Sequence, residues 1–290
     1  MNNISNLQNK EENLLLLYSQ KILYDKSKTI KYFLIILAIL NFLLGIISRQ
    51  LVEYKTIFLI LIFSIAFISK YLQNTVNKLN NLASSTQELF DRKLFNFEIK
   101  SRHLLNNEIS DILSTAQNLK SKYPKKYIDN IIHTGNDKPN GVKDWYTDIP
   151  SSLPLNKAIL KCQKQNIFWD KTLIKSYKTL LILLSIFIAF IMIIFYWSQP
   201  LSNLVIAIFS SLSLFDILIK EFISINKFTS SNIKIETIIN TIYDSNNIYT
   251  SKLKDLQSKI FERRNSGLNV PSILHKINTK KLHALYKREN

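Results

Sequence analysis

Charge-free apolar runs alternate with polar, lysine-rich segments along this chain. The longest run, residues 179–197, holds 19 residues without a charge. A second run follows a three-residue break and continues to Ile219 with Asp216 as its only charge. About 20 apolar residues cross the hydrocarbon core as a helix, and so short a break leaves room only for a tight turn. The pattern predicts a transmembrane helical hairpin over 177–220.

Two earlier runs, about Tyr32–Ser48 and Thr56–Leu72, predict another hairpin over 32–72. In each hairpin, small and polar residues recur at helical spacing on one face of a span. Such a face either allows close packing of membrane helices or lines a pore, and both interpretations stay open. The candidate residues are Asn41 and Gly45 in the first span and Asn203, Ala207 and Ser210 in the fourth.

The lysines predict how the spans are oriented. They gather before Tyr32, after Ser69, before Thr179 and after Ile219, whereas the two hairpin turns carry few. The positive-inside rule then places both termini and the whole middle region in the cytoplasm. We therefore expect a multi-pass protein of the cytoplasmic membrane.

The polar segments are predicted to be mainly helical. Residues 1–31 are predicted to form an amphipathic helix, which either packs on the rest of the cytosolic domain or lies on the anionic leaflet. Its apolar positions are Ile4, Leu7, Leu14, Tyr18 and Ile22, and its basic end holds Lys21, Lys26, Lys28 and Lys31.

The middle insert, 73–176, contains no Gly or Pro before Pro124, so the second span is predicted to continue as a helix beyond the membrane. A weak alternation predicts a short strand at Lys93–Ile99, and Leu104–Lys122 is predicted to be another helix. Residues 134–154 have the composition of a loop. Asn156 is predicted to cap a helix from about Lys157 to Tyr177 that leads into the third span.

The last segment, 221–290, has no Gly or Pro before Gly267. The fourth span is therefore predicted to continue as a long helix, interrupted or bent near 229–231 or 244–247. A short helix is predicted to start at Val270-Pro271. The fold class is thus an all-α membrane protein, with two transmembrane hairpins and a mainly helical cytosolic domain formed by the insert and both termini.

Composition argues against enzymatic chemistry. The chain has four glycines, four scattered histidines and one cysteine, and it lacks phosphate-loop and zinc-protease motifs. Cys162 alone cannot form an internal disulfide and fits a reducing cytosol. We expect no catalytic site, no metal and no cofactor.

The formal charge of +17 suggests, beyond its role in topology, a binding site for an anion. Nucleotides require cations for their phosphates and aromatic faces for their bases. Lys143, Trp145 and Tyr146 in the loop meet both needs, as do Arg263 and Arg264 beside a phenylalanine. These five residues are candidate nucleotide ligands, and each is also compatible with an ordinary contact between domains.

Five sequence blocks, in order around the four spans, resemble one known family. They lie in the amino-terminal segment, after the second span, in the loop, before the third span and in the carboxy-terminal segment. They are Gln8-Asn9 with Gln20; Gln87-Glu88-Leu89-Phe90-Asp91; Asp144-Trp145-Tyr146 with Leu153-Pro154; Cys162-Gln163, Asn166 and Trp169-Asp170; and Leu256-Gln257, Ile260 and Arg263. The layout resembles the SMODS-associated four-transmembrane effectors of bacterial cyclic-oligonucleotide anti-phage systems. Where that family often has Ala-Arg before the Cys-Gln pair, this chain has Lys157-Ala158 and Ile159.

The resemblance implies a function. A partner cyclic-oligonucleotide synthase would supply a ligand, which binds the cytosolic domain. The effector would then form a homo-oligomer and permeabilise the bacterial inner membrane, killing the infected cell; no nucleic acid polymer is involved. Alternatives are a membrane-anchored nucleotide sensor or scaffold that recruits a partner, and a small transporter. The transporter is disfavoured because no charge-bearing repeat lies at mid-membrane depth.

Overall fold

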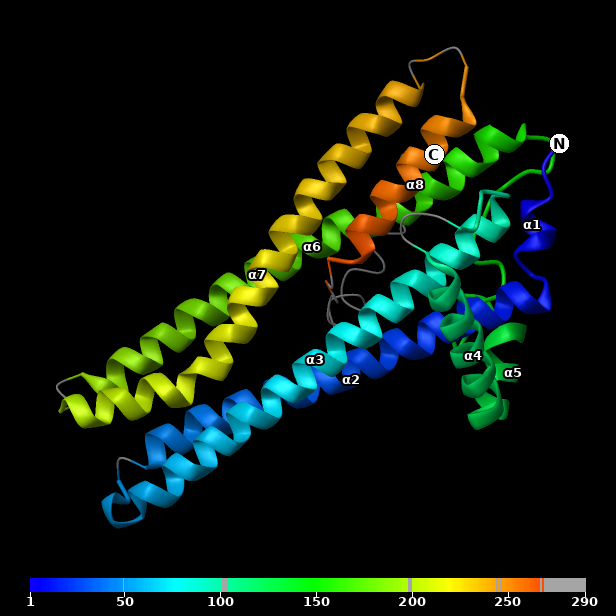
Figure 1. The fold of residues 1–290 in the computed structure, drawn as a ribbon. Coiled ribbons are helices and arrows are strands. Elements are labelled where there is room, and N and C mark those ends of the chain that lie inside the picture. The colour runs from blue at the N-terminus through cyan, green and yellow to red at the C-terminus, as the bar shows by residue number, and fades with distance from the viewer. Residues whose placement is uncertain are drawn as a thin grey trace. The chain divides into compact units, whose positions relative to one another are not determined.

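A computed structural model describes residues 1–48, 50–100, 104–197, 200–243, 245, 247–266 and 268, without the side chains of 52, 168–173, 196, 201 and 202. Within this part the chain forms helices and no named strand (Figure 1). The helices are α1 Ile4–Leu7, α2 Glu11–Ile47, η1 Val52–Tyr54, α3 Lys55–Leu94, α4 Asn106–Lys122, α5 Pro124–Ile132, α6 Leu155–Tyr196, α7 Leu201–Tyr243 and α8 Thr250–Arg264. The helix predicted from Val270 lies outside the described residues.

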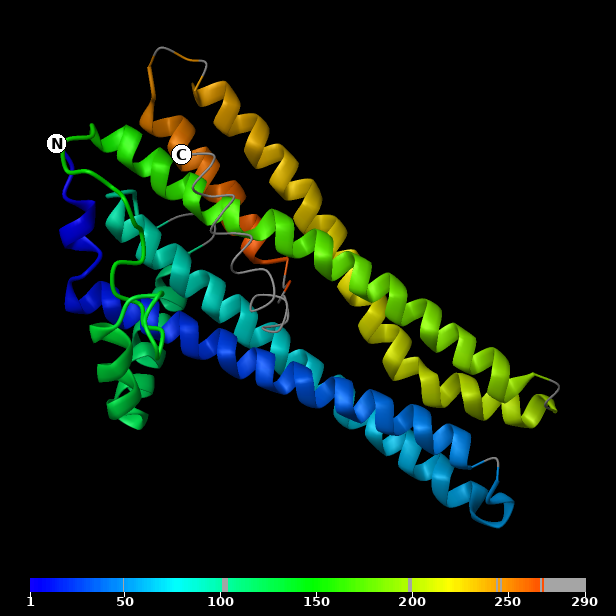
Figure 2. The ribbon, with the colours of Figure 1, turned by 180° about the vertical axis from the view of Figure 1, so that it is seen from behind.

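Four helices are long and apolar enough to cross a membrane: α2, α3, the 174–195 part of α6, and α7. In both views α2 runs beside α3, and α6 runs beside α7 (Figures 1 and 2). The structure therefore confirms an all-α membrane protein with four spanning helices.

The chain divides into two compact units. We call residues 1–26, 79–171 and 228–267 the head unit, and residues 27–78 and 172–227 the membrane unit. Each of α2, α3, α6 and α7 contributes one end to the head unit and the other to the membrane unit. Among the described residues, α2, α3, α6 and α7 each continue across the border between the units without a break.

The amino-terminal segment is part of the hydrophobic core of the head unit. Ile4, Leu14, Tyr18 and Ile22 are all buried there, so this apolar face contacts protein. The prediction of one helix over 1–31 is wrong in its extent. α1 ends at Leu7, and α2 starts at Glu11 and continues into the first span.

The strand predicted at Lys93–Ile99 is also wrong. α3 continues to Leu94, and the chain then turns at Asn96, whose φ is 55°. Phe95 and Phe97 are buried on either side of this turn, so the weak alternation reflects two inward-facing rings rather than a pleated strand.

One other local prediction needs correction. Asn156 lies inside α6, where its side chain donates to the Ile248 carbonyl, 2.7 Å away, instead of capping the helix. The carbonyl of Pro154 accepts the hydrogen bond from Ala158 N–H at the start of α6. The helix interruption predicted near 229–231 or 244–247 is confirmed at the second position: α7 passes 229–231 unbroken and ends at Tyr243, and α8 then runs back beside α6 (Figures 1 and 2).

The membrane unit buries few of its side chains. In the most apolar 18-residue windows of α3 and α6, only 11% is buried, against 28% in α2 and 33% in α7. Since lipid tails are as apolar as these side chains, the exposed faces of α3 and α6 suit contact with lipid or with further copies of the chain.

Candidate functional site

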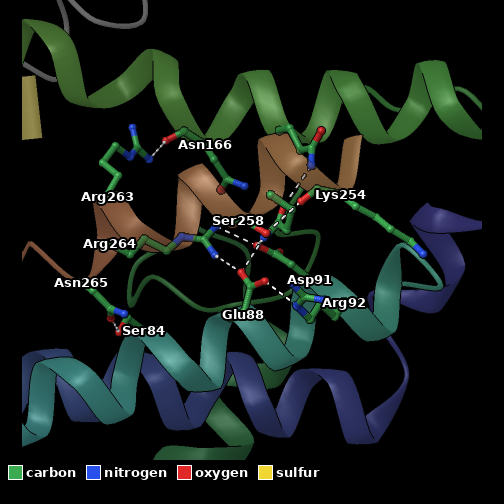
Figure 3. Close-up of polar contacts among 12 residues, drawn as sticks. Ser84, Glu88, Asp91, Arg92, Asn166, Lys254, Ser258, Arg263, Arg264 and Asn265 are labelled. Carbon is green, nitrogen blue, oxygen red and sulfur yellow. Dashed lines mark hydrogen bonds and ion pairs between the residues drawn. The ribbon is translucent and has the colours of Figure 1, made fainter. Parts of the chain in front are cut away.

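Four charged side chains meet in the interior of the head unit (Figure 3). Arg92 Nε lies 2.6 Å from Glu88 Oε1, one turn away on α3. Arg264, the last residue of α8, lies with Nη2 2.7 Å from Asp91 Oδ2 and with Nη1 3.8 Å from Glu88 Oε2. Both carboxylate side chains are fully buried and both arginines nearly so. Two buried acids thus face two buried bases.

Amide and hydroxyl groups satisfy the remaining acceptors of this cluster. Gln257 Nε2 donates to Glu88 Oε2 at 2.8 Å and to Asp91 Oδ2 at 3.1 Å. Tyr146 donates its hydroxyl proton to Asp91 Oδ1 at 2.7 Å and accepts a hydrogen bond from Asn166 Nδ2 at 2.8 Å. We call these seven residues, Glu88, Asp91, Arg92, Tyr146, Asn166, Gln257 and Arg264, the charge network. It joins α3, α6, α8 and the loop.

Burial dominates the electrostatics of the charge network. It raises the pKa of Glu88 above the usual carboxyl range, although Arg264 and Arg92 oppose the shift. It also raises the pKa of Tyr146 well above that of a free phenol, with Asp91 adding to the effect. Tyr146 is therefore a neutral donor at physiological pH. Removing one member of a buried ion pair leaves its partner uncompensated, which is strongly destabilising.

The loop that carries Tyr146 is anchored by backbone contacts. Gly141 donates its N–H to the Thr134 carbonyl, and a Cβ at this position would lie 1.8 Å from His133 O, so only glycine fits. Two side chains that precede α2 bond residues 144–146 of the loop. Asn9 exchanges hydrogen bonds with Asp144, and Gln8 bonds both the N–H and the carbonyl of Tyr146.

The five candidate nucleotide ligands do not form one open pocket. Tyr146 and Arg264 belong to the charge network. Arg263 is buried with its guanidinium donating to Asn166 O and Asn232 Oδ1, 4.9 Å from the Phe228 ring centroid. Lys143 is exposed, as is 37% of Trp145. Their role as nucleotide ligands stays a prediction.

A small cleft of about 280 Å³ lies between α7 and α8 in the head unit. Its lining residues are Thr237, Ile238, Thr241, Ile242, Lys252 and Asp255. Pockets for drug-sized ligands usually hold roughly 300–1,000 Å³. The cleft is therefore at the small end even for a mononucleotide.

The five candidate pore-lining residues are mostly buried within one protomer. Asn41, Gly45, Ala207 and Ser210 are buried, and Asn203 is half-buried. Ser210 donates to the carbonyl of Ala207 on its own helix. These positions are covered within one protomer, and the choice between helix packing and pore lining stays a prediction.

Contacts join the two hairpins at both ends of the membrane unit. Lys31 Nζ on α2 lies 2.7 Å from Glu221 Oε1 on α7, and Tyr177 on α6 donates its hydroxyl proton to Glu221 Oε2 at 2.7 Å. At the hairpin turns, Lys55 Nζ donates to Asn203 Oδ1 at 3.2 Å. Sequence reasoning missed Lys31, Tyr177 and Glu221 as a set, although each lies just outside a predicted span. Asp216, the one charge within the last apolar run, instead pairs with Lys220 on the same helix.

Comparison with known families decides the identity. The family model described as "SMODS-associating 4TM effector domain" matches residues 2–284. This chain belongs to the SMODS-associating 4TM effector family. No curated protein and no solved structure matches it. The effector is thus a membrane protein of the kind associated with SMODS synthase systems.

Residues from all five of the sequence blocks meet at or beside the charge network. Four blocks supply members of the network: Glu88 with Asp91, Tyr146, Asn166 and Gln257. The amino-terminal block supplies Gln8, which bonds the backbone of Tyr146. The side chains of Trp169 and Asp170 lie outside the described residues. The positions of these blocks along the sequence did not predict that they meet in space. The sequence signal that could have indicated this network is the recurrence of acidic and amide side chains among apolar residues in the blocks.

Proposed function

We propose that this effector binds a cyclic oligonucleotide on the head unit and, as a homo-oligomer, permeabilises the bacterial inner membrane to abort infection. A cyclic-oligonucleotide synthase would supply the ligand. The observation that carries the proposal is the charge network together with helix continuity. Glu88 lies on α3 and Asn166 on α6, and both helices extend unbroken into the membrane unit. A change in the network can therefore move the spans.

Trp145 and Tyr146 give the ligand a route to that network. An anionic ligand would meet the exposed Lys143 ammonium, and a base would stack on Trp145. The next residue, Tyr146, bonds Asp91 through its hydroxyl and Gln8 through its backbone. A displacement of Trp145 would therefore move Tyr146, and the hydrogen bond from Tyr146 would transmit that movement to Asp91 on α3.

Permeabilisation requires the hairpins to rearrange. Four packed helices enclose no aqueous lumen, and the candidate pore-lining residues of α2 and α7 are buried within the protomer except for the half-buried Asn203. Several protomers would have to turn these faces toward a shared axis. The contacts between the hairpins that this would break include Lys31–Glu221 and Lys55–Asn203.

The test is dye release from anionic liposomes that contain the purified effector, with and without a panel of cyclic di- and trinucleotides. The proposal expects release with one ligand and none without it. A Lys143→Gln/Trp145→Leu variant should lose the response. The matched control, Lys254→Gln/Tyr249→Leu, removes an exposed lysine and an exposed aromatic ring elsewhere on the head unit and should keep it. Release that needs no ligand would contradict gating.

The burial of the candidate pore face also favours a second function, a membrane-anchored nucleotide sensor or scaffold. That function expects ligand binding by calorimetry without dye release. An Asn203→Leu/Ser210→Leu variant separates the two. A pore that uses this face should lose conductance, whereas a scaffold should keep both ligand binding and signalling.

A further inference from the structure

A cluster of lysines surrounds Tyr123, at the corner between α4 and α5 of the head unit. Lys26 Nζ from α2 lies 5.5 Å from the centroid of the Tyr123 ring, and Lys122 Nζ lies 5.6 Å from it. Lys125 and Lys126 follow in the first turn of α5 and are exposed. No side chain caps the start of α5, so its positive end adds to the same field.

The local charge balance leaves this corner strongly basic. Residues 120–132 contain four lysines and one aspartate, and residues 21–31 also contain four lysines and one aspartate. Lys120 pairs with Glu11, and Lys31 pairs with Glu221. Two ammonium groups, each within 6 Å of the centroid of one ring, repel each other, and a bound anion would reduce that repulsion.

The outer face of α5 carries apolar residues beside these cations. Ile128 is 54% exposed and Ile132 is 56% exposed, whereas Tyr127 and Asn130 on the opposite face are buried in the head unit. Lys125, Ile128 and Ile132 are spaced by three and four residues and therefore lie on one face. Exposed isoleucines next to lysines are typical of a helix at a membrane surface.

Helix α2 brings Lys26 close to the first apolar run along the chain. Lys26 and the first residue of the apolar run, Tyr32, lie on the same unbroken helix. Six residues at about 1.5 Å each place them about 9 Å apart along the axis. This is about one Debye length at physiological salt, so the field of an anionic leaflet reaches Lys26.

We propose that Lys26, Lys122, Tyr123, Lys125, Ile128 and Ile132, the lysine corner, bind the phosphate groups of anionic lipids in the adjacent leaflet. The lysines contact the headgroup phosphates, and the two isoleucines enter the boundary between headgroups and acyl chains. This site is separate from the nucleotide site on the 143–146 loop. It fastens the α4–α5 corner of the head unit to the bilayer.

The experiment places a fluorescent reporter on the outer face of α5 in the full-length protein. Ile128→Cys is labelled with an environment-sensitive dye and reconstituted in nanodiscs of phosphatidylcholine, with or without phosphatidylglycerol. The native Cys162 is buried and burial raises its pKa, so it does not compete for the label. We expect a blue shift, and quenching by nitroxide-bearing lipid, only with phosphatidylglycerol. Ile233→Cys on α7 is the matched reporter because it is 60% exposed and lies about 21 Å beyond Ile219 along the helix.

A charge variant then tests whether the lysines cause the docking. Each lysine near an anionic surface changes the partition about fivefold, so Lys26→Gln/Lys122→Gln should shift the docking equilibrium by about 30-fold. The control is Lys164→Gln/Lys254→Gln, which removes a lysine 5.7 Å from the Tyr243 ring centroid and an exposed one. Equal emission in both lipid compositions, or equal loss in both variants, would overturn the proposal. So would a cyclic dinucleotide in phosphatidylcholine discs that reproduces the full effect.

Discussion

The head unit and the membrane unit use polar groups in different ways. In the head unit, two buried carboxylates are surrounded by two arginines, a glutamine and a tyrosine. In the membrane unit, Lys31–Glu221 with Tyr177 and Lys55–Asn203 join the two hairpins. Apolar burial stabilises helix packing in water but not between helices in lipid. We therefore expect the head unit to keep one packing arrangement and the two hairpins to rearrange more easily.

The largest expected effect comes from breaking the charge network in the head unit. Arg264→Met leaves Asp91 without its closest cation, and we expect a loss of about 3–5 kcal/mol in unfolding free energy. Arg264→Lys should recover only part of this, because an ammonium cannot reproduce the planar contacts of guanidinium. Denaturant unfolding with hydrogen exchange on α8 gives the measurement. A loss equal to that of the exposed control Lys254→Gln would mean that the network contributes no stability.

A smaller effect is expected at the inner contact between the hairpins. Lys31→Met and Glu221→Gln should show a coupling free energy of about 1–3 kcal/mol in a double-mutant cycle of thermal unfolding in detergent. Glu221→Gln should also raise ligand-independent dye release, because the hairpins separate more easily. The control Asp216→Asn breaks an exposed pair within one helix and should change stability by no more than about 0.5 kcal/mol. Unchanged leakage from Glu221→Gln would argue against a holding role.

Replacing Asn41 distinguishes a helix-packing role from a pore-lining role in the first hairpin. Both polar atoms of its amide are buried and have no partner among the described residues. Replacing an unsatisfied amide by an apolar side chain removes its desolvation cost, so Asn41→Leu should stabilise the effector by about 1 kcal/mol. Thermal unfolding and dye release should be read together. Greater stability with lost release would assign the amide to a pore, and reduced stability would show that it has a partner in the membrane.

The smallest effect is a pH dependence carried by Glu88 in the head unit. Burial raises the pKa of this carboxyl group in the folded state, so the folded protein takes up its proton at higher pH than the unfolded chain. Lowering the pH through the folded-state pKa therefore increases the contribution of Glu88 to the unfolding free energy. The wild type should therefore gain stability relative to Glu88→Gln as the pH falls toward the ordinary pKa of a carboxyl group. A difference independent of pH would show that Glu88 stays ionised throughout.

Much of the fold was readable from local patterns. The lengths of the charge-free runs predicted four spans, and the missing glycines and prolines predicted helices that continue out of the membrane. Local errors arose where tertiary contacts replaced local rules. Phe95 and Phe97 turn inward without a strand, and Asn156 bonds the segment before α8 instead of capping α6. Of the candidate nucleotide ligands, Tyr146 and Arg264 lie in the internal charge network, and their role as ligands stays a prediction.

By itself, the sequence determined that this is a four-span membrane protein, and its blocks indicated the effector family, because span length and motif spacing are local properties of the chain. Only the tertiary structure showed which residues meet. Glu88 and Arg264 are separated by most of the chain, and so are Lys31 and Glu221. Buried charges are tolerated only next to opposite charges or donors, and that juxtaposition depends on how distant helices pack, which no local pattern specifies.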